Sequence, residues 1–320
     1  MRVLITGGSG FIGTNLVDFL VRSGYEVANL DYRPPLKKSH VPYWTDCDIL
    51  NLECVEAAFR AFRPESIVHL AARTDSFGRS VKDYTVNVAG TRNVIMACSR
   101  HDCVSRVVVV SSQFVHGPRH IPAHDEDFEP VNAYGESKAI AERETRYGGL
   151  ECTWTIVRPT NIWGPWHPRY PYEIWRYLAR GLYFHPNGGS VLRCYGYVRN
   201  VVHQVEQILN APPSMVAARV FYLGDPPIDL VLWVNAFSRG LCGRDVRTLP
   251  RGLLRIIARL GDTLTTAGAR FPLHSSRFRS MTEDYLVPME PTLDAFGPPK
   301  VSLEEAVVET ITWLRVQGLI

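Results

Sequence analysis

A tyrosine and a lysine stand four positions apart in the stretch Tyr134-Gly-Glu-Ser-Lys138, at the start of a segment with helical periodicity. Side chains at positions i and i+4 of a helix lie on the same face, so the phenol and the ammonium group are expected to be neighbours. A free tyrosine has a pKa of about 10 and is a poor base at neutral pH, but a nearby positive charge stabilises the phenolate. We therefore expect Lys138 to lower the pKa of Tyr134 and to make it a general base.

Ser112 closes a strand-like run whose centre, residues 107–110, is apolar on both faces. Such a run is typical of a central parallel strand that helices cover on both sides, and ligands bind outside the carboxyl ends of these strands. We expect the Ser112 hydroxyl to hydrogen-bond the same substrate oxygen that Tyr134 deprotonates. The Tyr134–Lys138 pair alone is a weak signal, because a surface tyrosine beside a solvated lysine has the same spacing.

Three glycines, Gly7, Gly10 and Gly13, lie between an apolar run and a helical pattern. A glycine-rich turn in this context lets a pyrophosphate approach the main chain and the amino end of the following helix. Asp31 ends the next strand-like run, where a carboxylate accepts a hydrogen bond from an adenosine ribose. These features predict bound NAD, whose oxidised nicotinamide would add its positive charge near Tyr134, although Arg33 could pair with the extra phosphate of NADP.

The elements that carry these residues alternate between strands and helices. Strand-like runs occur at 2–7, 26–31, 66–71, 106–112, 153–159 and 220–224, and helical patterns at 11–23, 51–62, 83–101 and 134–147. This alternation predicts an α/β fold with a Rossmann-type, doubly wound parallel sheet.

The texture changes after Pro159, where Trp, Tyr, Pro and Gly become frequent. We expect a dinucleotide-binding domain at 1–160, to which the chain returns at about 200–232. We expect the remainder, 161–320, to form mainly a smaller substrate-binding lobe from 161–199 and 233–300, followed by a carboxyl-terminal helix at 302–316. A capping box, Ser302-Leu303-Glu304-Glu305, predicts the start of that helix.

One amphipathic stretch, residues 251–264, allows two interpretations. It is either a basic helix lying on a membrane surface or a helix of the lobe that packs on its apolar face. The second interpretation is favoured, because packed amphipathic helices are common.

The composition is ordinary for a soluble enzyme of 320 residues, with 46% hydrophobic and 21% charged residues. A net charge of +3 without a cluster of arginines does not favour nucleic-acid binding. The seven cysteines contain no CxxC pair, so we expect neither a metal site nor a disulfide framework. We also expect no signal peptide and no integral membrane segment, and hence a cytoplasmic protein.

Taken together, the motifs resemble those of extended short-chain dehydrogenases/reductases, in the NAD-dependent epimerase/dehydratase family that acts on nucleotide-sugars. The resemblance covers essentially the whole chain. It rests on TGGSGFIG (6–13), HLAA (69–72), VNVAGT (86–91), SSQFVHG (111–117), YGESK (134–138), RPTNIWGP (158–165), RCYGYVRNVV (193–202) and SLEEAVVETITWL (302–314).

The resemblance implies roles for particular residues. The residues implied to bind NAD are Gly7, Gly10, Phe11, Ile12, Gly13, Asp31, Asp48, Ile49, Ala71, Ala72, Asn87, Ser111, Tyr134 and Lys138. Among these, Asp48 and Ile49 would contact the adenine. The residues implied to bind the nucleotide-sugar are Ser112, Gln113, Asn161, Arg193 and Arg279, although the sequence around Arg279 departs from the family pattern. The catalytic residues would be Ser112, Tyr134 and Lys138.

Departures from the family pattern reduce the number of reactions that the chain is expected to catalyse. Dehydratases carry an acidic pair directly after the catalytic serine or threonine, and this chain has Gln113 and Phe114 there. Decarboxylases usually place a glutamate in this region, which is missing too. A nucleotide-sugar 4-epimerase with a transient 4-keto sugar is therefore the leading interpretation, within polysaccharide biosynthesis. The alternatives are an NAD(P)H-dependent reductase of a 4-keto nucleotide-sugar and a non-catalytic NAD-binding scaffold.

The sequence leaves the oligomeric state and the roles of several residues open. The resemblance implies a homodimer formed by the helices near 83–101 and 134–147. His116 stands where the family commonly has a tyrosine, and a structural histidine is favoured over a catalytic one. Arg73 and Asp75 either touch the sugar or form an ion pair. The aromatic segment 163–183 either stacks a nucleobase or belongs to the core of the lobe.

Overall fold

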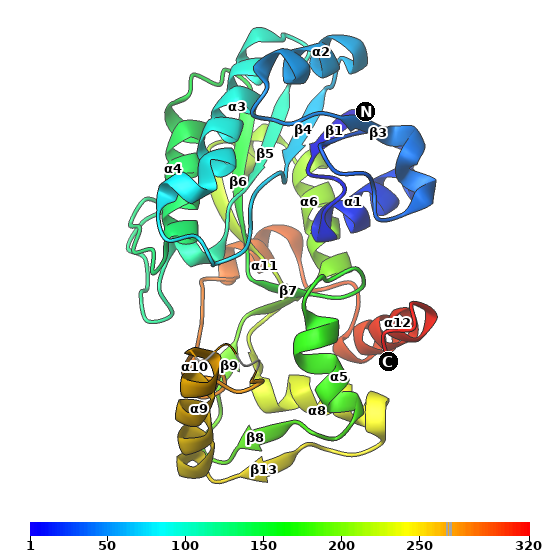
Figure 1. Ribbon diagram of the computed structural model, residues 1–320. Coiled ribbons are helices and arrows are strands. Elements are labelled where there is room, and N and C mark those ends of the chain that lie inside the picture. Colours follow the sequence, from blue (N-terminus) through cyan, green and yellow to red (C-terminus); the bar gives the residue numbers. More distant parts are fainter. Residues whose placement is uncertain (267, 269–270) are drawn as a thin grey trace.

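The computed structural model describes residues 1–266, 268 and 271–320, and its centre is a seven-stranded sheet in which all neighbours are parallel (Figure 1). The strand order is β11-β6-β5-β4-β1-β2-β3. The strands are β1 (Arg2–Thr6), β2 (Glu26–Asp31), β3 (Trp44–Asp46), β4 (Ser66–His69), β5 (Arg106–Val110), β6 (Thr153–Pro159) and β11 (Arg219–Leu223). The predicted doubly wound α/β fold is thereby confirmed. The edge strand β3 was not predicted, because its three residues form no apolar run.

Helices cover both faces of the sheet. Alternate residues of each strand point to opposite faces, and apolar side chains on both faces pack against these helices. The helices concerned are α1 (Phe11–Arg22), α2 (Leu52–Phe62), α3 (Thr91–Arg100), α4 (Ala133–Tyr147) and α6 (Val198–Asn210). Val3 and Ile5 of β1 join the core under α1 and α6, whereas Leu4 joins the core under α2 and α3.

The predicted helix at 83–101 is interrupted. It consists of a 3₁₀ turn, η2 (Val81–Tyr84), a π-helical turn, η3 (Val86–Gly90), and α3. A Cβ at Gly90 would lie 2.4 Å from the Ile49 side chain, so the glycine lets this turn approach the loop after β3. The Thr91 hydroxyl donates to the Asn87 carbonyl at 2.6 Å.

The rest of the chain forms a lobe beyond the carboxyl ends of the sheet strands, below the sheet in Figure 1. Its strands form three two-stranded sheets from β7 (Asn161–Trp163), β8 (Phe184–Pro186), β9 (Leu192–Arg193), β10 (Tyr195–Tyr197), β12 (Ile228–Asp229) and β13 (Arg247–Leu249). Its helical elements are η5 (Pro171–Trp175), α5 (Arg176–Ala179), α8 (Leu230–Cys242), α9 (Arg251–Thr266), α10 (Ser275–Ser280) and α12 (Leu303–Val316). The short helix α11 (Glu290–Phe296) packs instead against β11 of the central sheet. Ser302 caps α12 through the predicted capping box.

The aromatic segment after β6 supplies core rather than a free stacking surface. Trp163 and Trp175 are fully buried, and both contact Phe237 of α8. Trp233, also on α8, packs edge-on against Trp163. Of the two interpretations of this segment, the structure favours core of the lobe.

Two cysteines contradict the expectation that the chain has no disulfide. Cys47 and Cys54 are joined, with Cα atoms 5.9 Å apart. Cys47 follows β3 and Cys54 lies in the first turn of α2, so the short connection between these elements brings them together. In the described part of the chain, no helix combines the length and the apolar character that crossing a bilayer requires.

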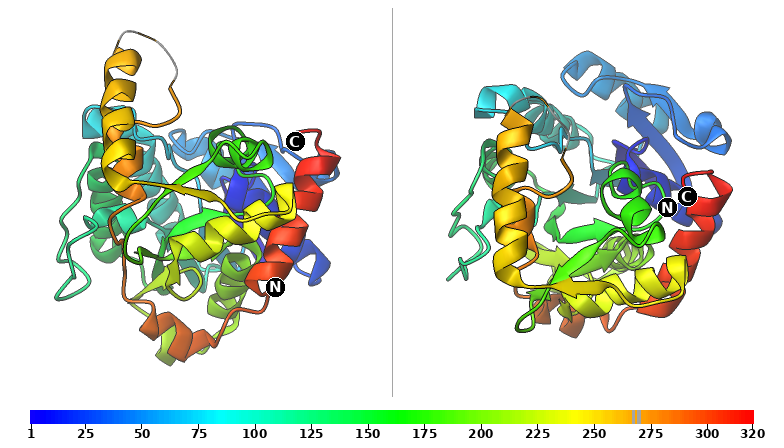
Figure 2. Two further views of the ribbon diagram at one scale, coloured as in Figure 1. Left: turned by 90° about the horizontal axis from the view of Figure 1, so that it is seen from below. Right: turned by 60° about the horizontal axis from the view of Figure 1, so that its bottom comes forward.

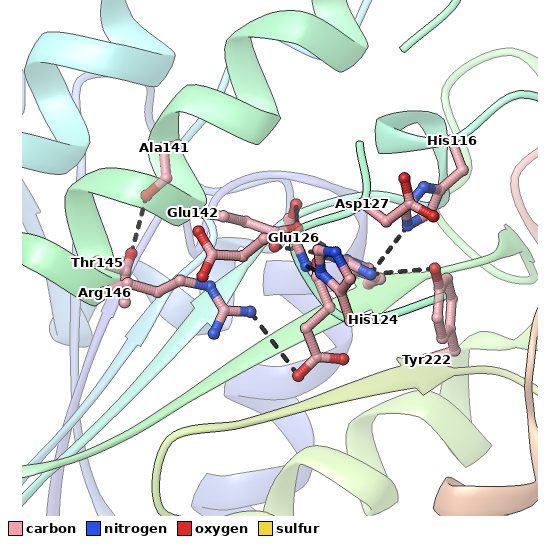
Figure 3. A network of polar contacts seen from close by, with 12 residues as sticks. His116, His124, Glu126, Asp127, Ala141, Glu142, Thr145, Arg146 and Tyr222 are labelled. Carbon is pink, nitrogen blue, oxygen red and sulfur yellow. Dashed lines mark hydrogen bonds and ion pairs between the residues drawn. The ribbon is translucent and has the colours of Figure 1, made fainter. Parts of the chain in front are cut away.

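A buried ion pair ties α4 to the sheet. Arg158 of β6 and Glu142 of α4 are 1% and 0% exposed, and their charged atoms lie 2.7 Å apart. Glu142 also accepts a hydrogen bond from the Ser111 hydroxyl at 2.6 Å, while Arg158 lies 3.1 Å from the Tyr222 hydroxyl and 3.0 Å from Nε2 of His116. Figure 3 shows Glu142, His116 and Tyr222 arranged around this centre. The pair therefore joins β5, β6, β11 and α4 beside the candidate site.

We expect Glu142→Gln to lower the free energy of unfolding by about 3–5 kcal/mol, because it leaves the Arg158 guanidinium buried without its counter-charge. Urea unfolding measures this loss. Glu144→Gln on the same helix is the matched control: Glu144 pairs with Arg92 at the surface, where an ion pair contributes about 1 kcal/mol or less. Equal losses in the two variants would contradict the assignment.

Three buried histidines predict how stability depends on pH. Burial lowers the pKa of His69 and of His167 to about 3, and burial together with Arg158 lowers that of His116 to about 4. Below pH ~6.5 the unfolded chain therefore binds protons that the folded chain does not, so the free energy of unfolding falls as pH falls from about 7 toward 4. Thermal melts across this range measure the slope. His116→Asn should reduce the slope, and the exposed His124→Asn should not; a flat profile would refute the prediction.

Candidate active site

The turn between β1 and α1 has a shape that only glycine permits. Gly7 has a φ of +76°, and a Cβ there would lie 2.6 Å from the backbone nitrogen of Ala71. A Cβ at Gly13 would lie 2.3 Å from the Gly7 carbonyl oxygen. Packing within the protein therefore requires both glycines. Gly10 differs, because a Cβ there would have only the Gly7 oxygen near it, at 3.3 Å, and its other sides are open to a ligand.

The amino end of α1 offers hydrogen-bond donors to an anion. The main-chain amides of Phe11, Ile12 and Gly13 have no acceptor among the described residues, and Gly10 provides no side-chain cap. Free amides and the positive end of the helix dipole together form a binding site for phosphate. The predicted pyrophosphate of NAD fits this site.

Asp31 stands at the carboxyl end of β2, next to the glycine turn, and is buried. One of its carboxylate oxygens accepts from the Ser9 amide at 3.1 Å, and the other accepts from the Arg33 amide at 3.0 Å. The Arg33 side chain is exposed and lies over the ring of Tyr32. The carboxylate is thus fixed where a ribose hydroxyl would donate to it.

The other residues expected to bind NAD surround the same edge of the sheet. Ile49 is buried against the turn that precedes α3, while Asp48 is exposed and accepts from the Leu50 amide at 2.9 Å. Ala71 and Ala72 follow β4 and are half-buried.

Asn87 has a positioning contact that the sequence did not indicate. Its side-chain oxygen accepts from the Arg73 amide at 2.8 Å, and its nitrogen donates to the Arg73 carbonyl at 3.0 Å and to the Ser137 hydroxyl at 2.9 Å. Asn87 therefore links the loop after β4 to α4. Of the two interpretations of Arg73 and Asp75, the structure favours the ion pair, since their charged atoms lie 2.7 Å apart.

The three predicted catalytic residues are buried and come together at the carboxyl end of β5. Ser112 caps the 3₁₀ turn η4 (Gln113–Val115), and its hydroxyl lies close enough to the Tyr134 phenol to lower the pKa of that group. Gly135 makes this approach possible, because a Cβ there would lie 2.0 Å from the Phe114 carbonyl oxygen. The first turn of α4 consequently rests directly on η4. Lys138, one turn further along, donates to the Val110 carbonyl at 2.8 Å.

Burial has the largest effect on the pKa of Tyr134. Burial raises this pKa to about 12, and the nearby Ser112 hydroxyl and the charge of Arg169 only partly oppose the effect. The Lys138 ammonium group is held at the end of β5, and burial lowers the pKa of Lys138 itself to about 8. The expected joint effect of Lys138 and bound NAD on Tyr134 stays a prediction. The protein's own groups therefore keep Tyr134 protonated at neutral pH.

The predicted substrate residues are only partly brought together. Gln113 is fully buried, and neither atom of its amide group has a hydrogen-bond partner among the described residues. Arg193 of β9 is buried and donates to the Glu283 carbonyl at 3.1 Å. Asn161 begins β7 and is half-buried, whereas Arg279 is exposed on α10 and makes no side-chain hydrogen bond within the described chain.

Two residues near the site escaped the sequence analysis. The Tyr285 hydroxyl donates to the carbonyls of Gln113 and His116, at 3.2 and 2.8 Å, and its ring faces the Arg193 guanidinium. It thereby connects the lobe to the segment that follows β5. Arg169 lies close enough to Tyr134 to affect its pKa. No motif marks Tyr285, and only the position of Arg169 inside the aromatic segment could have indicated it. His116, expected to be structural, lies in the buried network around Arg158.

The curated relatives of this chain differ in their named activities. A curated N-acetyl-alpha-D-glucosaminyl-diphospho-ditrans,octacis-undecaprenol 4-epimerase from Escherichia coli O157:H7 is 31% identical over 213 residues, covering 64% of this chain and 62% of the relative. A 3-beta-hydroxysteroid dehydrogenase from Mycolicibacterium neoaurum is 33% identical over 180 residues, covering 51% and 48%. The matches thus span less than two thirds of both relatives.

Among solved structures, the UDP-glucose 4-epimerase of Thermus thermophilus in complex with NAD is 25% identical, with a TM-score of 0.73, over 98% of this chain and 99% of that one. The family model described as "NAD dependent epimerase/dehydratase family" matches residues 3–224. Because this match covers well over half of the chain, the protein belongs to the NAD-dependent epimerase/dehydratase family, whose cofactor is NAD.

Proposed function

We propose that this protein is an epimerase of a nucleotide-sugar and that the reaction passes through a transient 4-keto sugar. The observation that carries the proposal is the meeting of Ser112, Tyr134 and Lys138 at the carboxyl end of β5, on the same edge of the sheet as the glycine turn. In this proposal the sheet residues, 1–160 and about 200–232, bind NAD, and the lobe from 161–199 and 233–300 binds the sugar.

Each catalytic group has a defined task. Tyr134 accepts the proton of the sugar 4-hydroxyl, and Ser112 hydrogen-bonds the same oxygen. Bound NAD would supply a reversible hydride acceptor for the sugar C4 and a positive charge that favours the phenolate. The transient 4-keto sugar would have to turn in the site so that its other face receives the hydride. Lys138 binds the nicotinamide ribose, and Arg169 adds positive charge near the phenol. The unpartnered amide of Gln113 supplies a donor and an acceptor for a sugar hydroxyl.

The residues after Ser112 argue against dehydration. Neither Gln113 nor Phe114 can protonate a leaving hydroxyl, so the 4-keto sugar has no acid to drive loss of water. Epimerisation needs no net oxidant, because the hydride returns. The same three catalytic groups would also serve a reductase of a 4-keto sugar, which is the second candidate. A scaffold without catalysis is disfavoured by the intact catalytic group.

A homodimer formed through α3 and α4, a cytoplasmic location and a role in polysaccharide biosynthesis complete the proposal. The family resemblance supports the dimer and the pathway class. The Cys47–Cys54 disulfide argues against a cytoplasmic location, because disulfides are rare in reducing compartments.

Tyr134→Phe tests whether the site is catalytic. It removes the hydroxyl and leaves the ring, so turnover should fall at least about 100-fold, while the Kd for NAD changes less than about twofold. Turnover is followed by product chromatography and NAD binding by calorimetry. Tyr147→Phe, on the exposed end of the same helix, is the control and should leave both unchanged. Full turnover in Tyr134→Phe would refute the catalytic assignment, and loss of NAD binding alone would favour the scaffold.

A substrate panel tests the reaction type. The protein is incubated with NAD and with UDP-, GDP-, dTDP- and CDP-sugars, and products are separated with mass detection. Since one relative acts on a sugar-diphosphate carried by undecaprenol, a polyprenyl-diphosphate sugar belongs in the panel. A new product of unchanged mass is expected. Turnover only with NADH and a 4-keto sugar would establish the reductase instead, and a product lighter by water or carbon dioxide would contradict epimerisation.

A further inference from the structure

Helix α9 has an apolar face that is wider than its contact with the lobe. Leu254, Ala258 and Gly261 are buried, and with Phe278 of α10 they hold the helix in place. A second row of large apolar side chains is left in solvent; we call it the α9 stripe. It consists of Leu253, Ile256, Leu260 and Leu264, which are 45%, 58%, 59% and 43% exposed.

The stripe is continuous along the helix. Its members are spaced three or four residues apart, which places them on one side of a helix with 3.6 residues per turn. On such a helix the stripe lies between the buried face and a sector that carries Arg255 and Arg259. Half-buried Ile257 joins the stripe to the buried face. An apolar row beside arginines is the arrangement of helices that lie in a membrane interface.

The charge of the helix suits an anionic surface. Arg255 and Arg259 are exposed, and neither pairs with an acid among the described residues. The Arg255 guanidinium lies over the Phe278 ring of α10, so Arg259 is the one of the two that no such contact within the described chain draws toward the lobe. Asp262 is the one acidic residue within α9, and Ser275 engages its carboxylate through the main-chain amide, at 3.0 Å, and the hydroxyl. These hydrogen bonds lower the pKa of Asp262 and keep it within the protein's own network. The solvent side of α9 is therefore cationic and apolar.

The helix also lies where a flat surface can reach it. In the left view of Figure 2, one end of α9, drawn in gold, projects beyond the body of the molecule. A single row of four side chains falls far short of the ~800 Å² per partner that a standard protein interface buries.

We propose that α9 docks this protein onto an anionic lipid bilayer. The α9 stripe enters the boundary between headgroups and acyl chains, and Arg255 and Arg259 lie at the level of the lipid phosphates. The short helix α10, which carries Arg279, packs along α9 and would be held next to the bilayer. This inference goes beyond the proposed function, because it holds for any sugar bound by the site.

Vesicle flotation of the full chain tests the proposal. The vesicles are phosphatidylcholine alone or phosphatidylcholine mixed with phosphatidylglycerol, and no NAD or sugar is added, so the outcome is independent of catalysis. The wild-type protein should float with the anionic vesicles and less with the neutral ones. Ile256→Ser/Leu260→Ser should lower the bound fraction by about tenfold or more, and Arg255→Gln/Arg259→Gln should remove the preference for anionic lipid.

The control replaces equally exposed apolar residues elsewhere. Leu232→Ser/Val308→Ser changes α8 and α12 and should bind vesicles like the wild-type protein. Thermal melts check that both double variants fold, and Leu264→Ser alone serves if the stripe variant does not. Failure of the wild-type protein to float, or equal losses in the stripe and control variants, would overturn the proposal. So would light scattering in which the stripe variant alone dissociates, since the stripe would then join two copies of the chain.

Discussion

The arrangement of the site depends on the buried charge pair between Glu142 and Arg158. Glu142 lies one turn beyond Lys138 on the same face of α4, and it also holds the hydroxyl of Ser111, the residue before Ser112. Arg158 comes from the neighbouring strand β6, so a single carboxylate sets the distance between the catalytic helix and two strands. Burying two charges costs free energy that a matched, fully hydrogen-bonded partner offsets. The geometry is therefore held by an interaction that tolerates little displacement.

Burial has a second consequence, for proton transfer. Removing Tyr134 from water raises its pKa, and removing Lys138 from water lowers its pKa, so both shifts favour the neutral forms. The groups of the protein alone therefore do not stabilise the Tyr134 phenolate enough to offset the effect of burial. A positive charge brought into the same dry site acts through a low dielectric and has a large effect there. In the proposed reaction, the positive ring of bound NAD would supply this charge.

The sequence predicted what depends on local pattern. The sheet, the helices next to it, the glycine turn and the Tyr134–Lys138 spacing all follow from periodicity or from the conformations open to glycine. What it missed depends on contacts between distant segments. Tyr285 reaches Gln113 across the interior, the Cys47–Cys54 bond follows from the packing of β3 and α2, and the pKa of Tyr134 follows from its burial. The residue types at these positions do not indicate which distant residues they contact.

Helix α9 also shows what a local sequence pattern leaves undetermined. Its periodicity predicted an amphipathic helix, and the lobe indeed covers Leu254 and Ala258. Periodicity reports how wide the apolar face is, but the neighbouring elements decide how much of that face is covered. Here β8, β13 and α10 are short and reach only one side of it, so Ile256 and Leu260 stay in solvent. The two interpretations of residues 251–264 were therefore never exclusive, because one face of a helix can pack on the lobe while the adjoining face meets a second surface.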